Sequence, residues 1–400
     1  MSTITLRFWL LELYALTLAL IRMPGGVHTD EAKYLLSIPY PHPPALRTLF
    51  ALVREMPMQE FFIRFLIASA LVQAVWLLVD IGYVLSHRRR KVLAISWLLS
   101  AAFILQAGTV MMAPLTALFG LVCVWLALRP QPFEKTSVPL LACLWFFAIF
   151  SAYQSVLYLP LLIGVLRAAH LSWRKIFFFL GFPLFLLGAY TLINPLALAS
   201  LVHVSVQDAT LALGMRLSNI LWICAIAGSG IVTLAGIVGI VGSYRIDFIA
   251  TLLLLLGFIA LSSQDYYAIL LTPVLCAGIM MLLAQRRISG ELFIPLYVIS
   301  TAVFVFMAFP RTSITPARMT MRFLEEQGID GLVLIDGPFG HEWQYESIGL
   351  PIGRFTQTLS SEIEASAAAI VCTKKTCEED ISEQWVRMEG APVEVWVHRL

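Results

Sequence analysis

The chain has 400 residues, of which 59% are hydrophobic and 13% are charged, and its mean hydropathy is +0.84. Soluble domains carry about 45–50% apolar and about 25% charged residues, so this apolar excess is too large for one buried core. The composition predicts a polytopic α-helical membrane protein. Its Lys and Arg residues are scattered through short loops, which argues against a nucleic-acid-binding face.

Apolar stretches suited to membrane helices recur along the first three quarters of the chain. A spanning helix needs about 20 mainly apolar residues. The stretches at 138–152 and 154–168 are short and could instead form one kinked helix or a re-entrant pair. We predict about eleven spans, near residues 5–22, 61–84, 92–108, 113–128, 138–152, 154–168, 176–194, 219–241, 248–262, 266–284 and 292–309.

Lys and Arg are concentrated in alternate loops between these stretches. The loop HRRRK at 87–91 is strongly basic, whereas the loops near 109–112 and 262–265 contain no Lys or Arg. Basic short loops stay on the cytoplasmic side of a membrane. We therefore predict a cytoplasmic N-terminus, an outer first loop at 23–60 and an outer C-terminal region.

The last 91 residues differ in composition from the rest of the chain. Residues 1–309 hold 19 Lys and Arg against 11 Asp and Glu, whereas residues 310–400 hold 8 against 14. We predict a transmembrane domain at 1–309 and a small α/β domain at 310–400. Cys372 and Cys377 could form a local disulfide there if the region lies outside the cytoplasm.

An amphipathic pattern and short apolar runs outline the elements of this C-terminal domain. An amphipathic helix is predicted at the start, in MTMRFLEEQ. A second helix is predicted for EEDISEQWVRM, at 378–388. Strands are predicted for GLVLI, AAAIVCT and VEVWVH.

The first outer loop contains the densest group of polar and rigid residues, HTDEAKYLLSIPYPHPP at 28–44. Asp30 and Glu31 could act as a general base, bind a divalent cation such as Mg²⁺ or Mn²⁺, or favour a helix N-terminus. In the last case Thr29 or Asp30 would be the capping residue. The prolines that follow exclude a helix, so His42 is carried on a stiff segment that could also be a simple connector.

The motif DEAKY (30–34) followed by HPPAL (42–46) resembles the first outer loop of glycosyltransferases of the C-type fold that use lipid-linked sugars. The resemblance is to the bacterial family similar to protein O-mannosyltransferases and lipid A aminoarabinose transferases. MQEFFIRFLIASAL (58–71) and SSQDYYAILLTPVLCAGIMML (262–282) are similar to two helical segments of that family. Met112 departs from it, because relatives often carry Asp at this place.

The resemblance implies a helical bundle like that of the C-type glycosyltransferases, in a bacterial inner membrane. It also implies transfer, with inversion, of a sugar from a polyprenyl-phosphate carrier to a lipid, glycan or protein acceptor on the outer face. Asp30 is the expected general base and Glu31 the second catalytic candidate, and either could hold a divalent cation. The expected substrate-binding residues are Tyr34, His42, Arg64, Asp265 and Tyr267.

Several alternatives stay open at the level of sequence. The chain could instead be a transporter or flippase of lipid-linked glycans, although the inverted repeats typical of transporters are not apparent. The substitution at Met112 also leaves room for an inactive scaffold. Arg64 could bind phosphate, pair with Glu60 or Asp30, or extend to the lipid surface. Glu12 lies within the first predicted span, without a partner that the sequence reveals.

Overall fold

The computed structural model describes residues 3–38, 43–54, 56–129, 138–194, 213–262, 264–285, 290–312, 315–336, 340–347, 349–354, 367–373 and 385–398. The chain divides into two compact units. Unit 1 comprises Met1–Ile21 with Pro39–Thr312, and unit 2 comprises Arg22–Ile38 with Ser313–Leu400. The first part of the predicted outer loop thus belongs to the unit that contains the C-terminal region.

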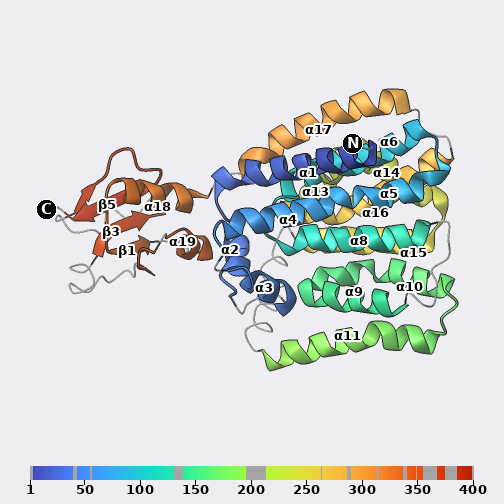
Figure 1. Ribbon diagram of the computed structural model, residues 1–400, viewed down its shortest axis with the longest axis horizontal. Helices are drawn as coiled ribbons and strands as arrows, with labels where there is room; N and C mark the ends of the chain where they lie inside the picture. Colours follow the sequence, from blue (N-terminus) through green and yellow to red (C-terminus); the bar gives the residue numbers. More distant parts are fainter. Residues whose placement is uncertain are drawn as a thin grey trace. The chain divides into compact units, whose positions relative to one another are not determined.

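Unit 1 is helical, and its long helices run in nearly the same direction (Figure 1). Its elements, including three 3₁₀ segments, are α1 (Thr3–Arg22), α3 (Pro44–Ala51), α4 (Gln59–Gln73), α5 (Val75–Ile81), η2 (Gly82–Val84), α6 (His87–Leu98), α7 (Ala101–Gln106), α8 (Met112–Leu128), α9 (Val138–Ser151), η4 (Tyr153–Tyr158), α10 (Leu159–Ala168), α11 (Trp173–Ile193), α13 (Leu213–Ala227), α14 (Ile231–Ser243), α15 (Ile246–Leu261), η5 (Asp265–Tyr267), α16 (Ala268–Ala284) and α17 (Gly290–Thr312).

Among the described residues, three helical stretches are long and apolar enough to cross a membrane: Gln59–Val84, Trp173–Ile193 and Asp265–Ala284. Counting each bent pair of helices as one span raises this number to five. Other apolar helices, such as α8 and α15, have only 10–17 residues. The eleven predicted spans are therefore not confirmed, whereas the predicted helical architecture is.

The exposure of the apolar helices indicates a membrane-embedded protein. In the stretch Asp265–Ala284, which contains α16, 89% of the most apolar segment is buried, because α8 and α14 pack against it. In α11 only 22% is buried, and Phe177, Phe178 and Phe185 are exposed. An apolar helix with so much exposed surface is stable in lipid but not in water.

The region 138–168 forms two helices and not one. Between α9 and α10 the backbone of Ala152 is extended and η4 follows, so the helical hydrogen-bond pattern is interrupted. Pro160 lies in the first turn of α10, where proline is tolerated because its missing N–H would have no partner inside the helix.

Unit 2 contains a five-stranded sheet with helices, which confirms the predicted C-terminal sheet. The strand order is β2-β1-β3-β5-β4; β1 pairs in parallel with β2 and β3, whereas β5 pairs antiparallel with β3 and β4. The elements are η1 (Met23–Gly25), α2 (Thr29–Leu35), α18 (Pro316–Glu326), β1 (Leu332–Asp336), α19 (His341–Glu346), β2 (Ile352–Arg354), β3 (Ala367–Cys372), β4 (Trp385–Arg387) and β5 (Glu394–His398).

The core of unit 2 follows from the alternation of side chains along its strands. Val333 and Ile335 of β1 pack with Met321 and Leu324 of α18 on one face of the sheet. Leu334, between them in sequence, belongs to a second cluster. Successive strand residues point to opposite faces, so the four consecutive apolar residues of β1, 332–335, serve both clusters.

The second helix predicted for the C-terminal domain is wrong where the structure describes it. Residues 385–387 of the segment 378–388 form strand β4, which pairs with β5. Trp385 is buried against Ile370 and Cys372, and this tertiary packing outweighs the local helical pattern.

Only one of the two cysteines of the predicted disulfide lies in the described part of the chain. Cys372 is disulfide-bonded, and its expected partner, Cys377, lies outside the described residues. Four other cysteines are free: Cys123, Cys143, Cys224 and Cys276.

Candidate functional site

In unit 2, α2 carries the two adjacent carboxylates predicted from the sequence. The helix begins after His28, whose extended backbone makes it the N-cap residue. The backbone N–H of His28 donates to Oε2 of Glu31 at 3.0 Å, the reciprocal bond of a capping box. The expectation that Thr29 or Asp30 is the cap is wrong, because both residues already lie inside the helix.

Asp30 and Glu31 therefore have different surroundings. Glu31 is 1% exposed and holds the start of α2 through His28. The side chain of Asp30 is 31% exposed, and its Oδ1 lies 2.8 Å from Nζ of Lys33, one turn along the same helix. Glu31 is thus occupied in the structure of the loop, whereas Asp30 can be reached by a ligand.

Tyr34 and His42 are the other two residues of this loop that were predicted to bind substrate. Tyr34 is buried, together with Ala32 and Leu35 of the same helix. His42 lies outside the described residues.

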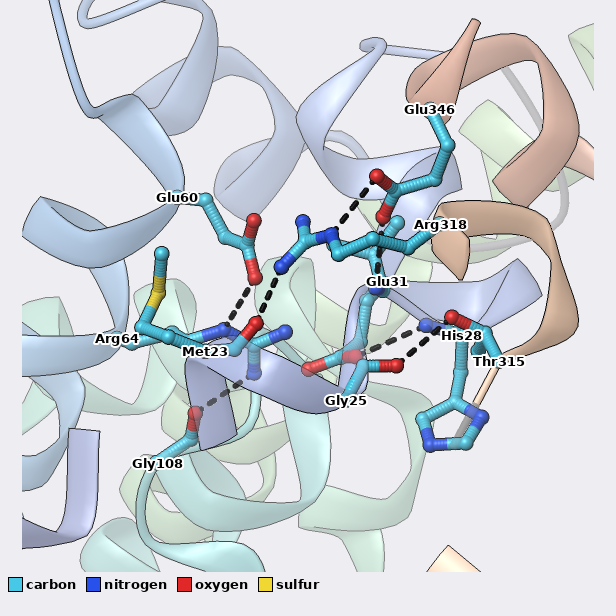
Figure 2. Close-up of polar contacts among 11 residues, drawn as sticks. Met23, Gly25, His28, Glu31, Glu60, Arg64, Gly108, Thr315, Arg318 and Glu346 are labelled. Carbon is cyan, nitrogen blue, oxygen red and sulfur yellow. Dashed lines mark hydrogen bonds and ion pairs between the residues drawn. The ribbon is translucent and has the colours of Figure 1, made fainter. Parts of the chain in front are cut away.

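A buried ion pair from the C-terminal part of the chain contacts the backbone that leads into α2 (Figure 2). Nε of Arg318 lies 2.9 Å from Oε2 of Glu346, and the two side chains are 9% and 6% exposed. Oε1 of Glu346 accepts a hydrogen bond from the N–H of Val27 at 3.1 Å. Arg318 also donates to the carbonyl of Met23. Both charged groups thus bind backbone preceding Asp30.

Further contacts reach the same segment. The N–H and the hydroxyl of Thr315 both donate to the carbonyl of Gly25, at 2.9 and 2.8 Å. The hydroxyl of Thr29 donates to Oε2 of Glu342. Gly26 has a φ of +76°, and a Cβ at this position would lie 2.5 Å from the Thr315 hydroxyl oxygen, so only glycine fits.

The sequence did not point to Arg318, Thr315, Glu342 or Glu346. They lie about 290–320 residues from the loop they contact, and their local sequence resembles ordinary helix ends. One signal was available: MPGG at 23–26 predicts a turn with an unusual backbone directly before the carboxylates.

In unit 1, Arg64 is buried inside α4, with 1% of its surface exposed. Its Nε lies 2.8 Å from Oε1 of Glu60, and another guanidinium nitrogen donates to the carbonyl of Gly108 at 2.8 Å (Figure 2). Of the alternatives left open by the sequence, pairing with Glu60 is correct and extension to the lipid surface is wrong. A buried guanidinium needs these partners because desolvation of its charge is costly.

Asp265 and Tyr267 lie in η5, where side chains from three segments of unit 1 meet. Nε1 of Trp222 in α13 donates to Oδ2 of Asp265 at 3.3 Å. Nε2 of Gln154 in η4 donates to the hydroxyl of Tyr267 at 3.2 Å. The hydroxyl of Tyr266 lies 3.4 Å from that of Tyr267. Asp265, Tyr266 and Tyr267 thus form a polar, aromatic cluster with Gln154 and Trp222, and substrate binding by Asp265 and Tyr267 stays a prediction.

A second polar group in unit 1 lies beside α3, directly after the HPP motif. Arg47 donates to the hydroxyl of Tyr190 in α11 at 2.8 Å, and Nδ2 of Asn194 donates to the same hydroxyl at 3.2 Å. Arg47 directly follows HPPAL in the sequence, so this cation lies next to the motif.

A divalent cation stays a prediction. In the described part of the chain, no group of three or more His, Cys, Asp and Glu side chains is arranged to hold a metal ion. Glu31 binds the N–H of His28 and Asp30 binds Lys33, and these contacts are made by the chain itself.

No family model, curated protein or solved structure matches this chain. The resemblance of the first loop to the lipid-linked-sugar glycosyltransferases is therefore carried by its motifs.

Proposed function

We propose that the protein is a membrane glycosyltransferase that moves a sugar from a polyprenyl-phosphate carrier to an acceptor hydroxyl at the membrane surface. The observation that carries the proposal is the difference between the two carboxylates of α2. Glu31 is buried and binds the backbone N–H of the N-cap residue His28, whereas Asp30 is accessible and has a cation, Lys33, beside it. A base must be accessible to its substrate and held in a defined position, and Asp30 meets both conditions.

The chemistry requires a base but no strong acid. The leaving group is a phosphate, which is stable as an anion. Asp30 takes the proton of the acceptor hydroxyl while the acceptor oxygen forms a bond to the anomeric carbon and the bond from that carbon to the phosphate oxygen breaks. The electron pair of the broken bond stays on the phosphate, and the single displacement inverts the anomeric carbon. A positioned general base contributes about 10²–10⁴-fold to such a step.

Unit 1 has features suited to a lipid-linked donor. Its exposed apolar helices fit a polyprenyl tail in a bilayer. Arg47 has the guanidinium group that binds phosphate well, and it is oriented by the Tyr190 hydroxyl. Asp265 and Gln154 are polar groups of the kind that bind sugar hydroxyls.

The disulfide at Cys372 supports an outer location for the C-terminal region, because disulfides persist in oxidising compartments. Together with the basic loop at 87–91, it supports a cytoplasmic N-terminus. The bacterial inner membrane is the location that the family resemblance implies. Membrane lipids, a lipid-linked donor and a lipid, glycan or protein acceptor are the partners that this proposal implies.

Asp30→Asn tests the proposal directly. The variant keeps the shape of the side chain but cannot act as a base, so transfer should fall by about 10²–10⁴-fold. Wild type, Asp30→Asn and the exposed control Asp330→Asn are expressed at matched levels in a strain lacking the gene. Mass spectrometry then measures surface glycans and polyprenyl-phosphate sugars. The control should behave as wild type, and Asp30→Asn should accumulate the lipid-linked donor.

Other outcomes would overturn the proposal. Full transfer by Asp30→Asn would remove Asp30 as the base. A change in the sidedness of lipid-linked sugars, without any transferred product, would identify a flippase. No difference in any glycan between wild type and the deletion strain would indicate a scaffold without this activity.

A further inference from the structure

The buried pair of Arg318 and Glu346 has no part in the transfer step, yet it is among the most enclosed charged groups of unit 2. Burying two charges costs free energy unless each also satisfies further hydrogen bonds. Here those bonds go to the backbone of one short segment, from Arg318 to Met23 and from Val27 to Glu346. The pair therefore fixes the main chain just before α2.

These contacts are made to a short segment that has little regular secondary structure of its own. We call residues 23–28, between α1 and α2, the strap. The strap consists of η1, the left-handed Gly26 and two residues without regular structure. Such a segment makes few hydrogen bonds of its own, and charge-assisted bonds are the strongest available substitutes. Thr315 adds two more bonds at Gly25.

We propose that Arg318 and Glu346 are positioning residues, which hold the strap so that α2 presents Asp30 in one orientation. The effect on sugar transfer rests on the proposed function, whereas the claim that the pair holds the strap does not. The C-terminal end of α1 cannot by itself fix the position of Asp30, because Gly25 and Gly26, which lie between them, permit many backbone conformations. The C-terminal region is then a required part of the first-loop site.

Hydrogen exchange of the full-length protein in nanodiscs tests whether the pair holds the strap. The double variant Arg318→Met with Glu346→Leu replaces the pair by apolar groups of similar size, a change that buried pairs often tolerate without loss of stability. Amides of residues 23–31 should exchange roughly tenfold faster, since each lost hydrogen bond to a charged group shifts local opening by about that factor. Amides of β3 should keep their wild-type rates.

The matched control makes the same chemical change on the exposed face of α18. Arg322→Met with Glu325→Leu alters two exposed residues and should leave exchange of the strap unchanged. Unchanged exchange at 23–31 in the Arg318 and Glu346 double variant would overturn the inference. Equal acceleration in both double variants would do the same.

A milder pair of variants keeps the test decisive if the double variant does not fold. Thr315→Val removes the hydroxyl bond to Gly25 and keeps the size of the side chain, whereas Thr315→Ser keeps the bond. Exchange at 25–28 should rise in Thr315→Val and return to wild type in Thr315→Ser. Identical exchange in wild type and Thr315→Val would count against the strap being held from this side.

Sugar transfer by the same variants separates the two proposals. If Asp30→Asn is inactive, the Arg318 and Glu346 double variant should lose transfer about tenfold or more, in proportion to the loosening of the strap. A loosened strap with full transfer would show that the pair does not position Asp30. If Asp30→Asn is fully active, the proposed function fails, and the exchange data still decide whether the pair holds the strap.

Discussion

Adjacent residues in α2 have opposite environments because each step along an α-helix turns the side chain by about 100°. Glu31 is buried and its carboxylate accepts a hydrogen bond from the N–H of His28, whereas Asp30 is partly exposed and pairs with Lys33. Local sequence shows only two adjacent carboxylates, and the resemblance named Asp30 as the expected base and Glu31 as the second candidate. The structure distinguishes them: Asp30 is accessible, whereas Glu31 is buried and completes the capping box, so the proposed function places the base at Asp30.

Glu12 illustrates the same point within unit 1. Its Oε1 accepts hydrogen bonds from Ser69 at 2.9 Å and from Gln73 at 2.8 Å, both on α4. A carboxylate within an apolar helix is tolerated when a neighbouring helix supplies donors. The partners are 57 and 61 residues away in sequence, so no local pattern could reveal them.

Glu60 should be required for the stability of unit 1. Replacing it by Leu removes the carboxylate from the buried Arg64, and breaking a buried pair in this way costs about 3–5 kcal/mol. Thermal unfolding of the purified protein in detergent measures the effect. The double variant Glu60→Leu with Arg64→Met should recover most of the loss, and equal melting temperatures for wild type and Glu60→Leu would contradict the prediction.

At the scale of elements, the predicted span 219–241 is wrong as a single helix. It divides into α13 and α14, which are bent by 96° at Gly228–Gly230. Ser229 and Gly230 have positive φ, and the Ser229 hydroxyl binds the N–H of Ala101 and the hydroxyl of Thr301. The sequence AGSG carried a signal for this break, because paired small residues with glycine interrupt helices.

Helices α14 and α16 cross in close contact through glycines. A Cβ on Gly278 would overlap the backbone of Gly236, and one on Gly239 would overlap the backbone of Gly278. Small residues at such crossings let two helix backbones approach closely. The glycines therefore set how closely the central helix α16 packs against its neighbour.

Gly278→Val should separate these two helices and destabilise unit 1 by about 1–3 kcal/mol, the usual cost of overpacking. Gly257→Val in α15 is the matched control, because nothing lies within 4 Å of a Cβ there. Thermal unfolding in detergent should show a lower midpoint for Gly278→Val only. A similar decrease for both variants would point to helix propensity and not to the crossing.

At the scale of the whole molecule, the orientation predicted from loop charges can be measured. Asp330→Cys places a thiol in the C-terminal region, and His87→Cys places one in the basic loop. A membrane-impermeant maleimide should label Asp330→Cys in intact spheroplasts and label His87→Cys only after permeabilisation. The parent chain gives the background from its own cysteines. The reverse pattern would invert the topology and place Asp30 on the wrong side for the proposed reaction.

The sequence alone determined the properties that depend on composition and local pattern. The apolar excess indicated helices suited to lipid, and short apolar runs such as GLVLI indicated the C-terminal strands, because both follow from which side chains can be buried. The motif DEAKY also located the candidate carboxylates, since a short motif is contiguous in the chain.

Only the tertiary structure decided which of these residues are held and by what. Arg318 and Glu346 bind the strap from the other end of the chain. Glu60 pairs with the guanidinium of Arg64. Trp385 lies in a strand because it packs against the neighbouring strands of the sheet. Each outcome depends on groups distant in sequence, and the free energy of a buried charge or an unpaired strand is set by its neighbours in space.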